Sequence, residues 1–65
     1  MLYTVVEILD NKVVASWLPP YENLDEAKED CRFAISCCRK RNQPVPVFSI
    51  ENSDGTVVDV IRHEG

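Results

Sequence analysis

The first part of the chain contains two largely apolar segments of residues that favour strands. Residues 2–9 are rich in Val, Ile, Tyr and Thr, and residues 12–17 form a second apolar segment. Between them lies Asp10-Asn11, two residues that tolerate a positive φ. This pattern predicts a β-hairpin with a two-residue turn.

The register that this turn implies divides the hairpin into two faces. We assign the coherent apolar face to the core: Thr4, Val6, Ile8, Val13, Ala15 and Trp17. The opposite face then carries Tyr3, Val5, Glu7, Leu9, Val14 and Ser16.

The middle of the chain has the pattern of an amphipathic helix over residues 24–41. Pro19-Pro20 ends the preceding strand, and Asn23 with Glu26 three residues later resembles a capping box. Acidic residues crowd the first turns and basic residues the last, as the helix dipole favours. Helical spacing predicts a core stripe of Leu24, Ala27, Cys31, Ala34, Ile35 and Cys38. Asn42 and Pro44 close the helix.

The last part of the chain predicts a second hairpin, with strands at residues 45–51 and 56–62. Pro46 favours an edge or a strand start, and Gly55 suits the left-handed position of the turn. A regular register pairs Ile50 with Val58 and Phe48 with Val60 on the core face. The other face then carries Val47, Ser49, Glu51, Val57, Asp59 and Ile61.

Together these elements predict one small α+β domain over residues 1–65. The order is ββαββ, a four-stranded antiparallel sheet with one helix packed on one face. The composition, 45% hydrophobic and 28% charged, is typical of a globular chain and not of a disordered one.

The sheet face without a helix carries more apolar residues than contact with water alone explains. We interpret it as a contact surface, and the candidate interface residues are Tyr3, Val5, Val14, Val57 and Ile61. The alternative is that half-exposed Val and Ile serve strand propensity alone.

The outer face of the helix offers a second candidate patch. Phe33 and Cys37 are four residues apart and are expected to be neighbours on a face that the fold does not need. Glu29 and Lys40 flank them, and we expect these four residues to contact a partner. Whether the Cys37 thiol is reactive is left open, since its basic neighbours favour reactivity and its place late in the helix disfavours it.

Charge and targeting signals narrow the function classes. The formal net charge of −4 disfavours a general phosphate-backbone binder, which needs a basic footprint. Nucleic-acid binding through the basic flank of the helix therefore stays an alternative, with Lys28, Arg32, Arg39 and Arg41 as contacts. The chain has no apolar segment that predicts a membrane span and no signal-peptide pattern, so we expect a cytoplasmic location and no membrane partner.

No motif predicts catalysis, a metal site or a cofactor. Cys31 and Cys38 are seven residues apart on one helix, which does not suit the paired spacing of zinc ligands. The same separation excludes a disulfide between them within an intact helix. His63 has no nucleophile beside it in the sequence, and Gly55 is a turn glycine and not part of a phosphate loop.

The sequence therefore favours a small, non-enzymatic protein-interaction module. We expect it to form a homodimer through the open sheet face and to bind a further partner protein of unknown identity. Its size and acidic charge suit a prokaryotic or phage accessory protein that inhibits a basic partner by occluding it.

Overall fold

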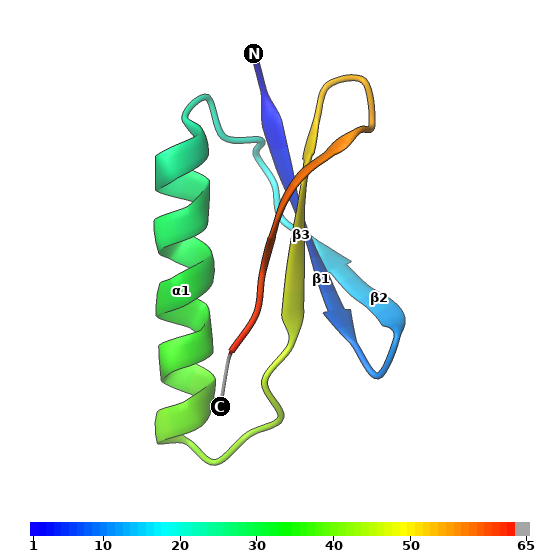
Figure 1. The fold of residues 1–65 in the computed structure, drawn as a ribbon. Helices are drawn as coiled ribbons and strands as arrows, with labels where there is room; N and C mark the ends of the chain where they lie inside the picture. Colours follow the sequence, from blue (N-terminus) through cyan, green and yellow to red (C-terminus); the bar gives the residue numbers. More distant parts are fainter. Residues whose placement is uncertain (64–65) are drawn as a thin grey trace.

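The computed structural model describes residues 1–63, and it confirms the α+β fold with the order ββαββ. Its strands are β1 (Tyr3–Leu9), β2 (Lys12–Ser16), β3 (Val47–Asn52) and β4 (Val57–Ile61), and its helix is α1 (Leu24–Lys40). The strands form one antiparallel sheet in the order β2-β1-β3-β4, and α1 lies along one face of it (Figure 1).

The turns follow the predicted backbone geometry. Asp10 and Asn11 have φ values of 54° and 62°, and Gly55 has a φ of 82°. Two consecutive residues with positive φ twist a two-residue turn in the sense that matches the twist of the flanking strands. The β1–β2 turn is therefore specified by the local sequence alone.

An asparagine lies at each end of α1: Asn23 is the N-cap, and Asn42 follows the C-cap residue Arg41. The Asn23 side chain accepts a hydrogen bond from the backbone N–H of Glu26 at 3.2 Å. At the other end, Asn42 adopts a φ of 54°, and the N–H of Gln43 donates to the Cys38 carbonyl at 2.9 Å. This left-handed cap ends the helix at Lys40, one residue before the predicted end.

Each edge strand contains a β-bulge that the sequence analysis did not anticipate. Near the first turn Ile8 pairs with Val13 as predicted, but Glu7 pairs with Ala15, so Val14 is an extra residue in β2. In the same way Glu51 pairs with Val57 as the turn dictates.

Beyond that point Ile50 pairs with Asp59, which leaves Val58 as the extra residue in β4. The two hairpins are therefore built alike, with one bulge at the same distance along each inner strand. Each bulge shifts the rest of its edge strand by one residue, and a shift of one residue exchanges the faces of a strand.

The predicted faces of β1 and of the end of β4 are consequently wrong. Val5 is 0% exposed and Ile61 is 8% exposed, and both belong to the core beneath α1. Tyr3 is partly buried and packs against the same core. The predicted register places Trp17 opposite Thr4, on the face of Val6. The bulge at Val14 instead moves Trp17 to the face of Val5, and the backbone N–H of Trp17 donates to the Val5 carbonyl at 2.8 Å.

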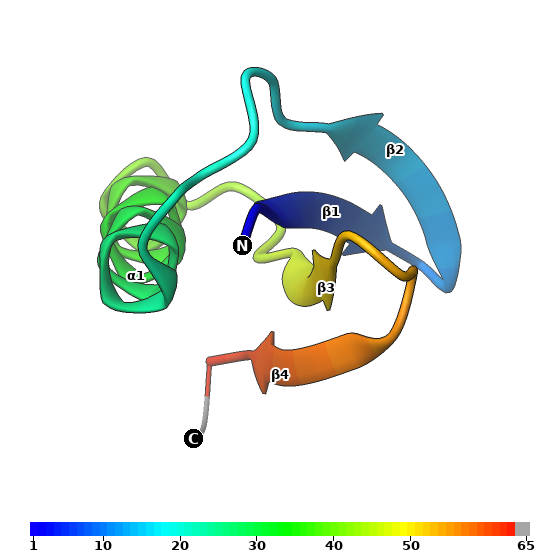
Figure 2. The same cartoon turned by 90° about the horizontal axis from the view of Figure 1, so that it is seen from above.

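The core lies between α1 and the face of the sheet that carries Val5, Phe48, Ile50 and Ile61. The helix contributes its predicted stripe: Ala27, Cys31 and Ile35 are buried, whereas Leu24, Ala34 and Cys38 are partly buried. The rings of Trp17 and Phe48 meet edge to face at 4.9 Å between centroids. Figure 2 shows that the sheet is twisted, since the end of β4 points toward α1 whereas the β1–β2 turn lies on the side away from it.

Candidate interaction surface

The sheet face turned away from α1 is built from regular rows across the strands. The register places Val6 beside Ser49 and Ser16, and Ser49 beside Val60. The neighbouring row joins Val13, Ile8 and Val47, and the next one joins Thr4, Glu51 and Val57. We call this set of ten side chains the open face. Each strand contributes alternate residues to the open face, because successive side chains of a strand point to opposite sides of the sheet.

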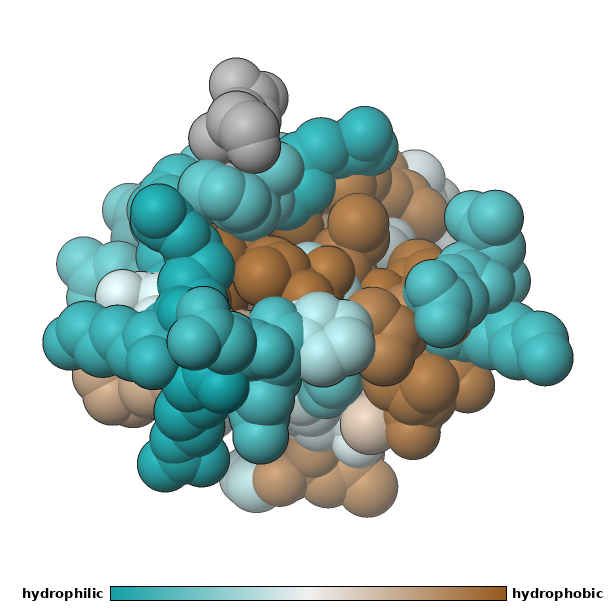
Figure 3. Space-filling view, turned by 90° about the horizontal axis from the view of Figure 1, so that it is seen from below, coloured by the Kyte–Doolittle hydropathy of each residue, from teal (hydrophilic) through white to brown (hydrophobic). Residues whose placement is uncertain are grey.

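The open face encloses a hollow of about 520 Å³ at the end of the sheet where the β1–β2 turn lies. Its lining is mostly aliphatic: Ile8, Leu9, Val45, Val47, Val57 and Val60, together with Asp10, Asn11, Ser49 and Arg62. Figure 3 looks at this end of the molecule and shows hydrophobic residues gathered in the middle, between hydrophilic flanks. The hollow is lined by β1, the β1–β2 turn, β3, β4 and the segment before β3, and not by β2.

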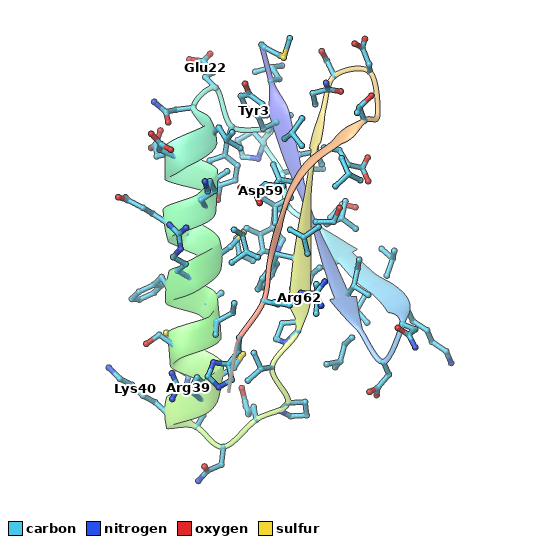
Figure 4. All side chains as sticks on the ribbon, in the orientation of Figure 1. Tyr3, Glu22, Arg39, Lys40, Asp59 and Arg62 are labelled. Carbon is cyan, nitrogen blue, oxygen red and sulfur yellow. The ribbon has the colours of Figure 1, made fainter. Side chains whose placement is uncertain are left out.

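Two opposite charges stand at the rim of the hollow. Asp10 is exposed in the turn between β1 and β2, and Arg62 is exposed directly after the end of β4. They come from opposite edges of the sheet, and within residues 1–63 neither forms a salt bridge. Figure 4 shows Arg62 near the end of β4, on the same end of the sheet as the β1–β2 turn.

Both edge strands have features that hinder pairing with another strand, and β4 has two of them. Besides its bulge, β4 has its Val60 N–H occupied by the Asp59 carboxylate at 2.8 Å. The same carboxylate contacts the Lys28 ammonium at 3.1 Å, and Figure 4 shows Asp59 between β4 and α1. Bulges and charged side chains are the devices by which edge strands avoid pairing with other strands. The open face is therefore a better contact surface than either edge.

The electrostatics of Asp59 follow from this geometry. Its hydrogen bond to Lys28 is the main cause that holds the pKa of the carboxyl below its usual value, and the Val60 N–H acts in the same direction. The group is ionised at neutral pH, as an edge-blocking carboxylate must be.

Of the predicted interface residues on the sheet, the structure leaves two on exposed positions. Val57 belongs to the open face and is 51% exposed, and Val14 is the bulged residue of β2 and is also exposed. Tyr3, Val5 and Ile61 lie toward α1 and cannot contact a partner from the open face.

The outer helix patch is present in part. Phe33 is 71% exposed, and Glu29 and Lys40 are exposed as predicted. Cys37 is half buried, so it does not extend the apolar surface around Phe33 as the helical spacing predicts. The patch therefore reduces to one exposed aromatic ring among charged neighbours.

The basic flank of α1 is weaker as a nucleic-acid contact than its sequence indicates. Lys28 is engaged by Asp59, which neutralises one of the four predicted contacts. Arg32, Arg39 and Arg41 are exposed.

A second group of polar contacts closes the end of the core. Tyr3 and Tyr21 exchange backbone hydrogen bonds at 2.7 and 2.8 Å, which attaches the linker before α1 to the start of β1. The Tyr21 hydroxyl donates to Asp30 at 2.7 Å, and burial, aided by Asp30, raises the pKa of Tyr21 to about 12. These contacts are structural because they fix the linker against the helix.

The remaining reactive side chains do not assemble into a catalytic or metal site within residues 1–63. Burial raises the pKa of the Cys31 thiol to about 11, so this cysteine is a neutral core residue. His63 is exposed, and no group of His, Cys, Asp or Glu in this part of the chain could hold a metal ion. No helix among the described residues is long and apolar enough to cross a membrane.

Comparison with known proteins adds no relative: no protein-family model matches the chain, and neither the curated proteins nor the solved structures yielded a match. The site must therefore be interpreted from its own geometry.

Three residues of the open face, Val6, Ile8 and Val60, were predicted to lie on the core face and were therefore missed as surface residues. The only signal for the bulges is that each edge strand begins with two adjacent valines, Val13-Val14 and Val57-Val58, which break the alternation. Such a pair also occurs in regular strands, so it does not by itself predict a bulge.

Proposed function

We propose that this protein is a non-enzymatic protein-interaction module that self-associates through the open face. The observation that carries the proposal is a hollowed, largely aliphatic sheet face that no part of residues 1–63 covers. Apolar surface of this kind is usually a contact site in a monomer. The three free thiols fit a reducing compartment, which is why we place the protein in the cytoplasm.

The total surface of the chain supports association. It exposes 4644 Å², whereas a globular monomer of 7.4 kDa is expected to expose about 4,200 Å². A domain this small also has a thin core, and covering the open face with a second copy adds buried apolar area that the single chain lacks.

Introducing a negative charge at an exposed valine or phenylalanine tests which face of the protein forms the dimer interface. Val60 lies on the open face, in the edge strand β4, and is 40% exposed, so Val60→Glu should fold normally and place a carboxylate in the interface. We expect the wild type to shift from monomer to dimer with rising concentration in sedimentation equilibrium, and Val60→Glu to remain monomeric over the same range.

Phe33→Glu is the matched control because it replaces another exposed apolar residue, on the outer face of α1. It should dimerise like the wild type, with both variants giving the circular dichroism spectrum of the folded protein. A wild type that stays monomeric up to millimolar concentration would refute the proposal. Loss of the dimer in Phe33→Glu but not in Val60→Glu would move the interface to the outer helix face.

A further inference from the structure

We propose that two copies meet with their open faces together, and that Asp10 of each copy forms an ion pair with Arg62 of the other. The inference rests on the proposed self-association and adds its geometry. It places β2 of one copy along β4 of the second, so that the two four-stranded sheets enclose a common apolar interior.

The aliphatic lining of the hollow faces solvent in a single copy, and a facing copy covers it. The hollow of each copy then becomes half of a core and not an empty space.

The choice of symmetry axis is the second argument. A closed homodimer uses the same surface twice around a two-fold axis. For two stacked sheets the axis can run along the strands, and then β1 and β2 of one copy lie over β3 and β4 of the other. The axis can also run across the strands, and then each strand lies over the same strand of the other copy.

Charge distinguishes these two arrangements. With the axis across the strands, the row of Val47 faces the row of Glu51, and a carboxylate is buried against aliphatic side chains. With the axis along the strands, Glu51 faces Thr4 and Val47 faces Ile8. The second arrangement places the Glu51 carboxylate opposite a hydroxyl that can donate a hydrogen bond, and not opposite aliphatic side chains, so we select it.

The same arrangement brings the rim charges together. The β1–β2 turn and the end of β4 lie at one end of the sheet, on its opposite edges (Figure 1). Ile61 pairs with Phe48, so Arg62 follows beside Val47, at the level of Ile8 and Val13. An axis along the strands sets Arg62 over the β2 side of the other copy, next to the turn that holds Asp10. Each dimer contains this contact twice.

The size of the face predicts a modest affinity. A strand of seven residues and a sheet of four strands give a face of about 23 by 19 Å, or roughly 440 Å² per copy. That area lies at the low end for specific complexes, where contacts are transient. We therefore expect a dissociation constant in the micromolar to millimolar range, and the experiment must cover those concentrations.

A charge exchange tests the pairing. Arg62→Glu sets two like charges at each seam and should weaken the dimer at least about tenfold. Adding Asp10→Lys restores opposite charges and the wild-type net charge of −4, and should bring the dissociation constant to within about threefold of the wild type. Any strain of Lys at the positive φ of residue 10 is present in monomer and dimer alike and cancels in this constant.

Arg39→Glu is the control for general repulsion, since it changes the net charge as much as Arg62→Glu but lies near the C-terminal end of α1 (Figure 4). It should leave the dissociation constant within about threefold of the wild type. Equal weakening by Arg39→Glu and Arg62→Glu, or a double variant that stays weak, overturns the Asp10–Arg62 pairing. If Val60→Glu still abolishes the dimer in that case, the open face remains the interface and only the axis is wrong.

Discussion

Asp59 shows how a single side chain of this protein serves two purposes at once. Its carboxylate binds Lys28 of α1 and also occupies the Val60 N–H on the free edge of β4. The first contact attaches the helix to the edge strand, and the second denies the edge to another strand. Because both contacts need the charged or accepting carboxylate, the residue couples local stability to pH.

Replacement of Asp59 by Asn should therefore have a pH-dependent cost. The pKa of the carboxyl is lowered in the folded state, so its contribution is present above the unfolded value of about 4 and is lost as the pH falls through the folded value. We expect Asp59→Asn to lower the free energy of unfolding by about 0.5 kcal/mol at pH 7. Urea titrations of both proteins should show this difference shrinking below about pH 4.

Asp54→Asn is the control, because Asp54 lies exposed in the β3–β4 turn away from Lys28. The difference in unfolding free energy between wild type and Asp59→Asn could instead be as large at pH 3 as at pH 7. In that case the ion pair with Lys28 would not be its source.

At the scale of elements, an asparagine lies at each end of α1, Asn23 as the N-cap and Asn42 directly after the C-cap residue, and the two have different roles. Asn23 supplies a side-chain acceptor, whereas Asn42 supplies a left-handed backbone. The two bulges act on the same scale, since each keeps a turn in its local register and still changes the face of the strand beyond it.

Substitution of the two asparagines should separate these roles. Asn23→Ala should lower the free energy of unfolding by about 1 kcal/mol, because the Glu26 N–H loses its acceptor. Asn42→Ala should cost about 1 kcal/mol through backbone strain, while Asn42→Gly should be neutral or stabilising. Thermal or urea unfolding measures all three, and equal effects of Ala and Gly at residue 42 would argue against the left-handed cap.

At the scale of the whole molecule, the sheet has one face committed to α1 and one face free. Val5 and Val6 are neighbours in β1 and carry the same side chain, but Val5 is buried beneath α1 and Val6 belongs to the open face. Val5 therefore contributes to the core, and under the proposed self-association Val6 contributes to the interface.

Alanine at these two neighbours should reveal that division. Val5→Ala should lower the free energy of unfolding by about 2 kcal/mol, because it removes fully buried methyl groups and leaves a cavity. Val6→Ala should cost less than about 1 kcal/mol in dilute solution, where the protein is monomeric, but should weaken the dimer. If Val6→Ala lowered the free energy of unfolding more than Val5→Ala, Val6 would be the buried residue, as the sequence predicts.

Local chemistry allowed much of the fold to be predicted. The turn at Asp10-Asn11, the cap at Asn23 and the buried stripe of α1 depend on residues close in sequence, so each could be identified without a structure. The outward position of Phe33 followed from helical spacing for the same reason.

The amino-acid sequence by itself determined the elements of this protein, their order and the register at each turn, because those depend on backbone preferences within a few residues. Only the tertiary structure decided which face of the sheet is buried. That choice depends on whether Trp17 and Ile61 can both pack beneath α1, and one extra residue in each edge strand makes this possible. Because a shift of one residue exchanges the two faces of a strand, the candidate interface contains Val6 and Val60 and not Val5 and Ile61.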